Sequence, residues 1–260
     1  MVYLNTVKSF IKKCLLFFGG IVLTGFVAGA LVFLLYNEKL PQGESGDAAN
    51  AKTMAMMKAL NKDQWDQIKT LKWTFNGRHH YNWDKQNNIV SVKWNGGEVL
   101  LQPDQQTGSV ISPSALSQSQ QEKYIQKAYR MFNNDGFWMA GPYKILDPGT
   151  ERSLVTLADG REGLKVKYTQ GGDTPGDSYV WILDENNLPV AVKMWVSVIP
   201  LGGVESTWEN YYSLGNGVSI AQDHKLLNLI NAKISNLEAT FTSENSSRQN
   251  NEEITLEGVN

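Results

Sequence analysis

The chain has 260 residues, enough for one large domain or two small ones. Its hydrophobic fraction is 42% and its formal net charge is −2 at pH 7, so most of the chain should fold. It lacks the basic excess with which nucleic-acid-binding proteins neutralise phosphates, and we expect no nucleic-acid partner. The 8 tryptophans and 10 tyrosines favour a broad apolar core, or a cavity, built from pleated sheet.

The N-terminal part contains an uncharged apolar run at residues 15–36, long enough to cross a bilayer as one helix. Lys8, Lys12 and Lys13 precede it, and basic residues prefer the cytoplasmic side. Residues 1–14 should therefore be cytoplasmic and the main domain extracytoplasmic. A cleaved signal peptide is the alternative, but the apolar run continues beyond the cleavage-like sequence at residues 28–30. We expect a single-pass signal-anchor.

The segment after this helix, residues 37–51, is polar and contains Pro41, Gly43 and Gly46, which is typical of a tether. A helix is expected from about Ala48 to Leu60, followed by a second short helix that opens with a capping box at Asn61. We place the folded domain at residues 52–235. Residues 236–260 are polar and should form a disordered tail.

From residue 71 the hydrophobic period changes to two, which indicates strands. One face is aromatic and the other polar, the pattern of a half-buried antiparallel sheet. If Gly77 lies near a bend, the aromatic face carries Trp73, Phe75, His79, Tyr81 and Trp83. Trp94 continues this pattern on the next strand, before a turn at residues 95–97.

The middle of the chain, residues 114–133, has the spacing of an amphipathic helix that Ser114 could cap. Further strands are expected at about 153–158, 163–169, 177–184, 190–199 and 204–214. Strands greatly outnumber helices and no βαβ alternation is present. The predicted fold class is therefore α+β, with a large antiparallel sheet.

The loop at residues 170–177 is rich in glycine and acidic residues and lies between two predicted strands. A phosphate-binding loop would need a following helix, and here a strand follows. Asp173, Pro175 and Asp177 suit a sharp hairpin corner, and we expect them at a rim of the sheet. A calcium site using Asp173, Asp177 and Asp184 is the alternative.

No hydrolase, metalloprotease or nucleotide-binding motif occurs, and we expect no catalytic residue, no metal ion and no cofactor. The best pair for zinc or acid–base chemistry is His80 with Asp84, which share a strand face. An exposed polar row is the simpler interpretation of that pair. His79 lies among aromatic residues and should be a hydrogen-bonded core histidine.

The strand at residues 190–198 has one unbroken apolar face, while Trp195 lies on the other. A curved sheet with large apolar residues must cover them with helices or fill the hollow with a ligand. Sequence alone leaves a ligand cavity and a packed core equally open. The candidate cavity residues are Trp73, Phe75, Tyr81, Trp83, Trp94, Trp181 and Trp195.

The motifs FNNDGFWMAGPYK, TPGD and KMWV resemble an uncharacterised bacterial membrane-anchored family. That family is similar to the LolA/LolB superfamily of outer-membrane lipoprotein carriers. The resemblance covers residues 48–234. It implies a half-open β-barrel with helices over the concave side, on the periplasmic side of the bacterial cytoplasmic (inner) membrane. It also implies binding of a lipid, a lipoprotein acyl chain or another apolar ligand. An envelope protein-interaction or sensor module is the second hypothesis, and a hydrolase is the third.

Overall fold

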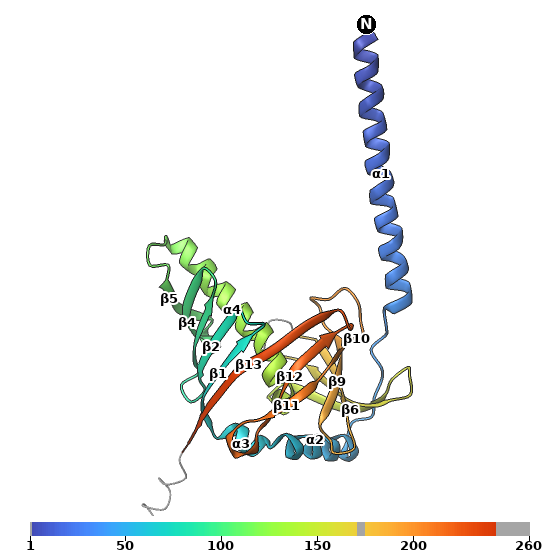
Figure 1. Cartoon of the computed structure of the whole chain (residues 1–260). Helices are drawn as coiled ribbons and strands as arrows, with labels where there is room; N and C mark the ends of the chain where they lie inside the picture. Colours follow the sequence, from blue (N-terminus) through green and yellow to red (C-terminus); the bar gives the residue numbers. More distant parts are fainter. Residues whose placement is uncertain (1, 171–174, 243–260) are drawn as a thin grey trace, which may run out of the picture.

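The structure, a computed structural model, describes residues 2–170 and 175–242, and of residues 2–12, 14 and 15 the backbone alone. Helix α1 (Val2–Tyr36) projects from a domain made of a large sheet and, within the described residues, three further α-helices (Figure 1). These are α2 (Asp47–Leu60), α3 (Lys62–Asp66) and α4 (Gln118–Ala140), with short 3-10 turns at η1 (Pro103–Gln105), η2 (Gly141–Lys144) and η3 (Gly215–Gly217).

The domain is organised around one open antiparallel sheet of 13 strands in the described residues, in the order β5-β4-β3-β2-β1-β13-β12-β10-β9-β8-β7-β6, with β11 paired to β12. The strands are β1 (Ile68–Phe75), β2 (His79–Asp84), β3 (Ile89–Trp94), β4 (Gly97–Gln102), β5 (Thr107–Ser112), β6 (Thr150–Thr156), β7 (Glu162–Tyr168), β8 (Ser178–Leu183), β9 (Pro189–Trp195), β10 (Val204–Thr207), β11 (Glu209–Ser213), β12 (Ser219–Leu226) and β13 (Ile230–Phe241). The predicted α+β class, with a large open antiparallel sheet, is confirmed.

Strand β13 holds the two halves of the sheet together. Its first residues pair with β12, from Ile230 opposite Leu226 to Lys233 opposite Asp223. Its remaining residues pair with β1, as far as Phe241 opposite Ile68. The tail predicted from residue 236 therefore begins too early, because the chain stays in the sheet through Phe241. Residues 243–260 lie outside the described part.

The aromatic strands form a hairpin whose register follows from its turn. Asn76 and Gly77 adopt positive φ values of 50° and 65°, a conformation that asparagine and glycine tolerate best. The turn places Phe75 opposite His79 and Trp73 opposite Tyr81. Period-two alternation then puts all the aromatic side chains on one face, as the sequence predicted.

Helix α4 crosses the concave side of the sheet and packs against β3, β4, β5, β12 and β13 (Figure 1). It begins later and ends later than predicted. Ser117, not Ser114, is its N-cap, and the backbone N–H of Ser117 donates to the Gln120 side chain at 2.9 Å. This reciprocal cap sets the start of the helix. The helix continues past Gly136 to Ala140, because the residues after Gly136 pack on the core.

Helices α2 and α3 cover the core at another end of the domain. The buried residues of α2 include Met56, Met57 and Leu60, whereas Met54 is exposed. The predicted capping box at Asn61 is absent: its side-chain amide instead donates to the Asn216 carbonyl at 2.7 Å. Asn61 adopts a left-handed conformation that ends α2 and begins α3 at once.

Candidate functional site

The candidate cavity residues of the first two strands lie beneath α4 in one aromatic layer. Trp73 stacks on Tyr81 with ring centroids 4.5 Å apart, and Phe132 of α4 lies 6.2 Å from Trp73. Phe132 also meets Trp83 edge-on at 5.4 Å. Trp94 is 5.6 Å from Tyr124 at the other end of the helix. The predicted shared face is therefore the face that α4 covers.

A second group of aromatic residues continues this layer under the C-terminal half of α4. Trp181 meets Trp208 edge-on at 5.1 Å, and Phe137 of α4 lies 6.2 Å from Trp181. Trp138 stacks on Trp208 at 5.8 Å. Trp73, Trp181 and Trp208 are at most 2% exposed. The rings thus pack against one another, at the spacing that favours aromatic contacts.

Several polar atoms in this layer are buried without a hydrogen-bond partner. They include the indole N–H groups of Trp73 and Trp181 and both ring nitrogens of His224. Such groups are uncommon, because each costs roughly 1–3 kcal/mol when it loses water without gaining a partner. Burial lowers the pKa of His224 to about 4, and nearby backbone groups only partly offset this effect. His224 is therefore neutral at pH 7, within 4.0 Å of the Trp208 ring.

A buried carboxylate on α4 links the helix to the aromatic hairpin. Asp135, 2% exposed, accepts a 2.6 Å hydrogen bond from the Tyr81 hydroxyl and lies 2.6 Å from Nδ1 of His79. Burial and the Asp135 charge raise the pKa of Tyr81 far above its usual range, so its hydroxyl stays protonated. His79 is hydrogen-bonded, as expected, but its side chain is 32% exposed, so it lies at the margin of the core and not within it. Asp135 was missed, although it follows Phe132 by three residues and so shares its helix face.

The alternative catalytic pair, His80 and Asp84, is not brought together. Nδ1 of His80 is 3.0 Å from the Thr74 hydroxyl, on the outer face of the sheet. Asp84 accepts hydrogen bonds from the backbone and side chain of Asn87, which lower its pKa. Among the described residues, no group of three or more His, Cys, Asp or Glu side chains could hold a metal ion.

A polar hollow of about 290 Å³ lies on the outer face of β1, β2, β3 and β13, not beneath α4. Lys72 bridges to Glu238 at 3.1 Å, and Lys93 lies 3.6 Å from Glu98. The hollow is lined by Lys72, Trp73, Thr74, His80, Tyr81, Asn82, Ser91, Lys93, Asn236 and Glu238. Eight of these ten residues carry polar or charged side chains, whereas an acyl chain requires a predominantly apolar lining.

The residues predicted at a rim of the sheet, in the loop between β7 and β8, differ in their exposure. Asp173 lies outside the described residues. Pro175 is exposed, and Asp177 is buried, with its carboxylate accepting the backbone N–H of Ser197 at 2.9 Å. Asp177 therefore joins the β7–β8 loop to the chain that follows β9.

Trp195 is separated from the other candidate cavity residues. It lies opposite Ser178, on the outer face, because Met194 and Val192 turn inward against Tyr179 and Trp181. Trp195 packs against a small outer cluster of Val155, Leu157, Val180, Ile182 and Ala191. The sequence placed it in the candidate cavity; the structure places it under the chain that follows α1.

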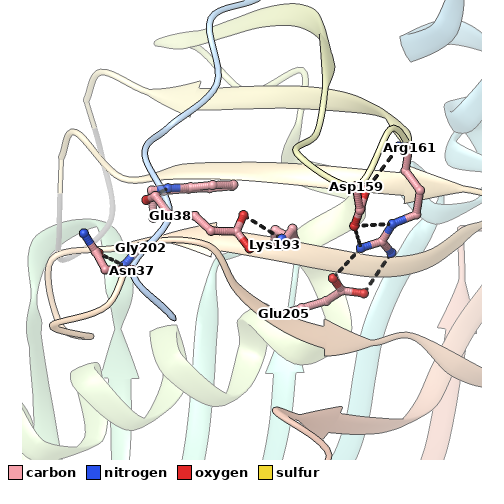
Figure 2. Close-up of polar contacts among 8 residues, drawn as sticks. Asn37, Glu38, Asp159, Arg161, Lys193, Gly202 and Glu205 are labelled. Carbon is pink, nitrogen blue, oxygen red and sulfur yellow. Dashed lines mark hydrogen bonds and ion pairs between the residues drawn. The ribbon is translucent and has the colours of Figure 1, made fainter. Parts of the chain in front are cut away.

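That chain, residues 37–44, is called the anchor segment here, and it lies along the outer face rather than forming a free tether (Figure 2). The backbone N–H of Glu38 donates to the Gly202 carbonyl at 3.0 Å, and Gly202 N–H donates to Oδ1 of Asn37 at 2.8 Å. The Trp195 indole N–H donates to the Glu38 carbonyl at 2.8 Å. The anchor segment is thus fixed to the domain two residues after α1 ends.

The rest of the anchor segment reaches the edge of the sheet. Lys165 donates to the Pro41 carbonyl at 2.9 Å. Glu44 and Leu154 of β6 exchange two backbone hydrogen bonds, at 3.0 and 2.9 Å. A Cβ on Gly43 would lie 2.5 Å from the Leu154 carbonyl, so glycine is required for this approach. Strand β6 is the last strand of the sheet, and this pairing covers part of its otherwise unpaired backbone.

An ion pair holds the anchor segment close to the end of α1. The ammonium of Lys193 lies 2.6 Å from both carboxylate oxygens of Glu38, and the two side chains are 7% and 37% exposed. Beside it, Arg161 bridges Asp159 and Glu205 (Figure 2). Hydrogen bonds from Arg161 lower the pKa of Asp159 to about 2.

No family model and no curated protein matches this chain. Among solved structures, it is similar to a DUF1329 family protein from Desulfovibrio piger, with a TM-score of 0.34 and 11% sequence identity, over 75% of this chain and 94% of that chain. A likeness this weak supports no statement about function.

Proposed function

We propose that the protein is a membrane-anchored extracytoplasmic module that binds an apolar ligand between the concave face of its sheet and α4. The ligand would be a lipid or a lipoprotein acyl chain. The observation that carries the proposal is the aromatic layer under α4, in which the buried indole N–H groups of Trp73 and Trp181 lack partners. These donors would gain partners from the ester or carboxyl oxygens of an entering lipid.

The membrane location rests on α1. Its segment Leu16–Tyr36 has 21 residues, a mean hydropathy of 2.3 and no burial against the domain. A helix of this length and composition can cross a bilayer, and a signal sequence can have the same length and composition. The basic residues before it favour a cytoplasmic N-terminus and a domain on the periplasmic side of a bacterial inner membrane.

A ligand would have to displace α4 from part of the aromatic layer. Phe132, Phe137 and Trp138 of α4 are only partly buried, so the helix is not sealed into the core. Exposing a large apolar side chain costs roughly 1.5–3 kcal/mol. A twelve-carbon chain gains roughly 10 kcal/mol, at about 0.8 kcal/mol for each buried CH₂ group. Burial of one acyl chain could therefore offset the loss of several α4 contacts.

Photocrosslinking of the full chain tests the proposal. The protein is reconstituted in vesicles of bacterial lipid that contain a phosphatidylethanolamine with a diazirine in one acyl chain, irradiated, and mapped by peptide mass spectrometry. We expect adducts on Phe132 or on its neighbours Trp73 and Trp83, in addition to adducts in α1. Adducts in α1 show that the reagent works, so adducts confined to α1 would reject ligand binding beneath α4.

A second function is favoured by the close packing of the same rings. Trp181 is 0% exposed, and its contacts with Trp208 and Phe137 are those of a filled core. A filled core suits an envelope protein-interaction or sensor module, which needs no ligand. Adducts confined to α1, together with crosslinking of the domain surface to an envelope protein in intact cells, would favour this function.

A further inference from the structure

Two apolar turns project from the same end of the sheet. The loop between β9 and β10 carries Val198, which is 74% exposed. The turn between β12 and β13 carries Leu227 and Leu229, which are 48% and 82% exposed, and Ile230, the first residue of β13, is 60% exposed. We call these four residues the apolar rim. Single exposed apolar residues are ordinary, but a group at the tips of two neighbouring turns marks a contact surface.

Backbone hydrogen bonds place both turns near the chain that follows α1. The backbone N–H of Leu227 donates to the Glu205 carbonyl at 3.0 Å, so the β12–β13 turn adjoins the start of β10. The preceding loop is held by Gly202, whose carbonyl accepts the N–H of Glu38 at 3.0 Å. Both turns therefore lie at the end of the sheet where α1 joins the domain (Figure 1).

The distance from the membrane follows from this attachment. Glu38 follows Tyr36, the last residue of α1, by only two positions, and a chain of two residues spans at most about 7 Å. The headgroup layer on one side of a bilayer is itself roughly 5–8 Å thick. When Tyr36 lies at the boundary between the hydrocarbon core and the headgroups, the loop that holds Glu38 is consequently at the level of the lipid headgroups.

We propose that the apolar rim contacts the outer surface of the bilayer that α1 crosses, with Val198 and Leu229 inserted among the lipid headgroups. The proposal rests on the membrane anchoring proposed above and goes beyond ligand binding. The fastened anchor segment supports it, because Glu38 and Gly202 hold the rim beside the helix instead of letting the domain swing away on a tether. The domain then sits on the membrane with one fixed end toward it.

Environment-sensitive labels test this contact in the full chain. With Cys14→Ser as background, Val198→Cys and Leu229→Cys are labelled with the fluorophore NBD, and the protein is reconstituted in nanodiscs. The control is Asn186→Cys, an exposed site in the turn at the opposite end of β9, roughly 23 Å away at about 3.3 Å per residue. Intact mass spectrometry verifies that α1 is retained.

The rim labels should emit at shorter wavelength than the Asn186 label and lose most of their fluorescence when the discs contain phospholipid with a nitroxide near the headgroup. The Asn186 label should be unaffected. Rim labels as water-exposed as the control overturn the proposal. The proposal is also overturned if the emission shift appears only in discs that carry two copies of the protein, since the rim would then be a protein interface.

The two proposals fail separately. Quenched rim labels with diazirine adducts confined to α1 would keep the membrane contact and reject ligand binding. Adducts on Phe132 with unquenched rim labels would support ligand binding and reject the membrane contact.

Discussion

The ion pair between Glu38 and Lys193 should control whether the anchor segment stays attached to the sheet. Replacing Glu38 with Gln leaves the Lys193 ammonium, 7% exposed, without its counter-charge. Breaking a fully buried pair from one side costs about 3–5 kcal/mol, and an exposed pair contributes about 0–1 kcal/mol. Because the Glu38 side chain is 37% exposed, we expect an intermediate loss of about 2 kcal/mol. This loss raises the open population of the anchor segment about 30-fold.

Limited trypsin digestion of the full chain in nanodiscs measures this opening, because Lys39 is in the anchor segment and is cut only when the segment is released. Cleavage after Lys39 should be about 30-fold faster in Glu38→Gln when opening and closing are fast. Glu44→Gln is the matched control, since Glu44 contacts the sheet through its backbone. Unchanged cleavage in Glu38→Gln would show that the ion pair does not hold the segment.

Three further predictions concern the free energy of unfolding, measured by urea denaturation. Gly43→Ala should lower the free energy of unfolding by about 1–3 kcal/mol, because the new Cβ would lie 2.5 Å from a backbone carbonyl. Gly136→Ala on α4 is the control: its Cβ meets no atom within 4 Å, so this change should raise the free energy of unfolding by about 0.5–1 kcal/mol. Asp135→Asn should lower it by about 2 kcal/mol through weaker bonds to Tyr81, and a neutral effect would contradict the buried link between α4 and the hairpin. His224 takes up a proton at its usual pKa of 6.5 only in the unfolded chain, so stability should fall by about 3 kcal/mol as the pH drops from 6.5 to 4. His224→Leu should flatten that slope, and an unchanged slope would rule out His224 as its source.

Much of the fold was predictable because its signals are local. Alternation placed Trp73, Tyr81 and Trp83 on one face, and the Asn76–Gly77 turn fixed their hairpin. The ends of α4 and of β13 were less predictable. The helix begins at a Ser117–Gln120 cap that competes with Ser114, and β13 is polar in composition but pairs with β1 through Phe241.

The candidate site was predictable only in part, because the rings share a face by local pattern while their partners come from elsewhere. The amphipathic spacing of residues 114–133 puts Tyr124 and Phe132 on one apolar face, which a helix turns toward a core. Nothing local indicated that Asp135 would meet Tyr81 and His79, more than 50 residues away in the chain.

The sequence by itself determined the apolar N-terminal helix, the period of each strand and the residues that share a face, since all three depend on neighbours along the chain. The tertiary structure decided which face of β9 turns inward, and so placed Trp195 and Lys193 outside. It also decided what covers that outer face, because Glu38 reaches Lys193 across 155 positions of sequence. Contacts of that range depend on the register of the whole sheet, which no local pattern specifies.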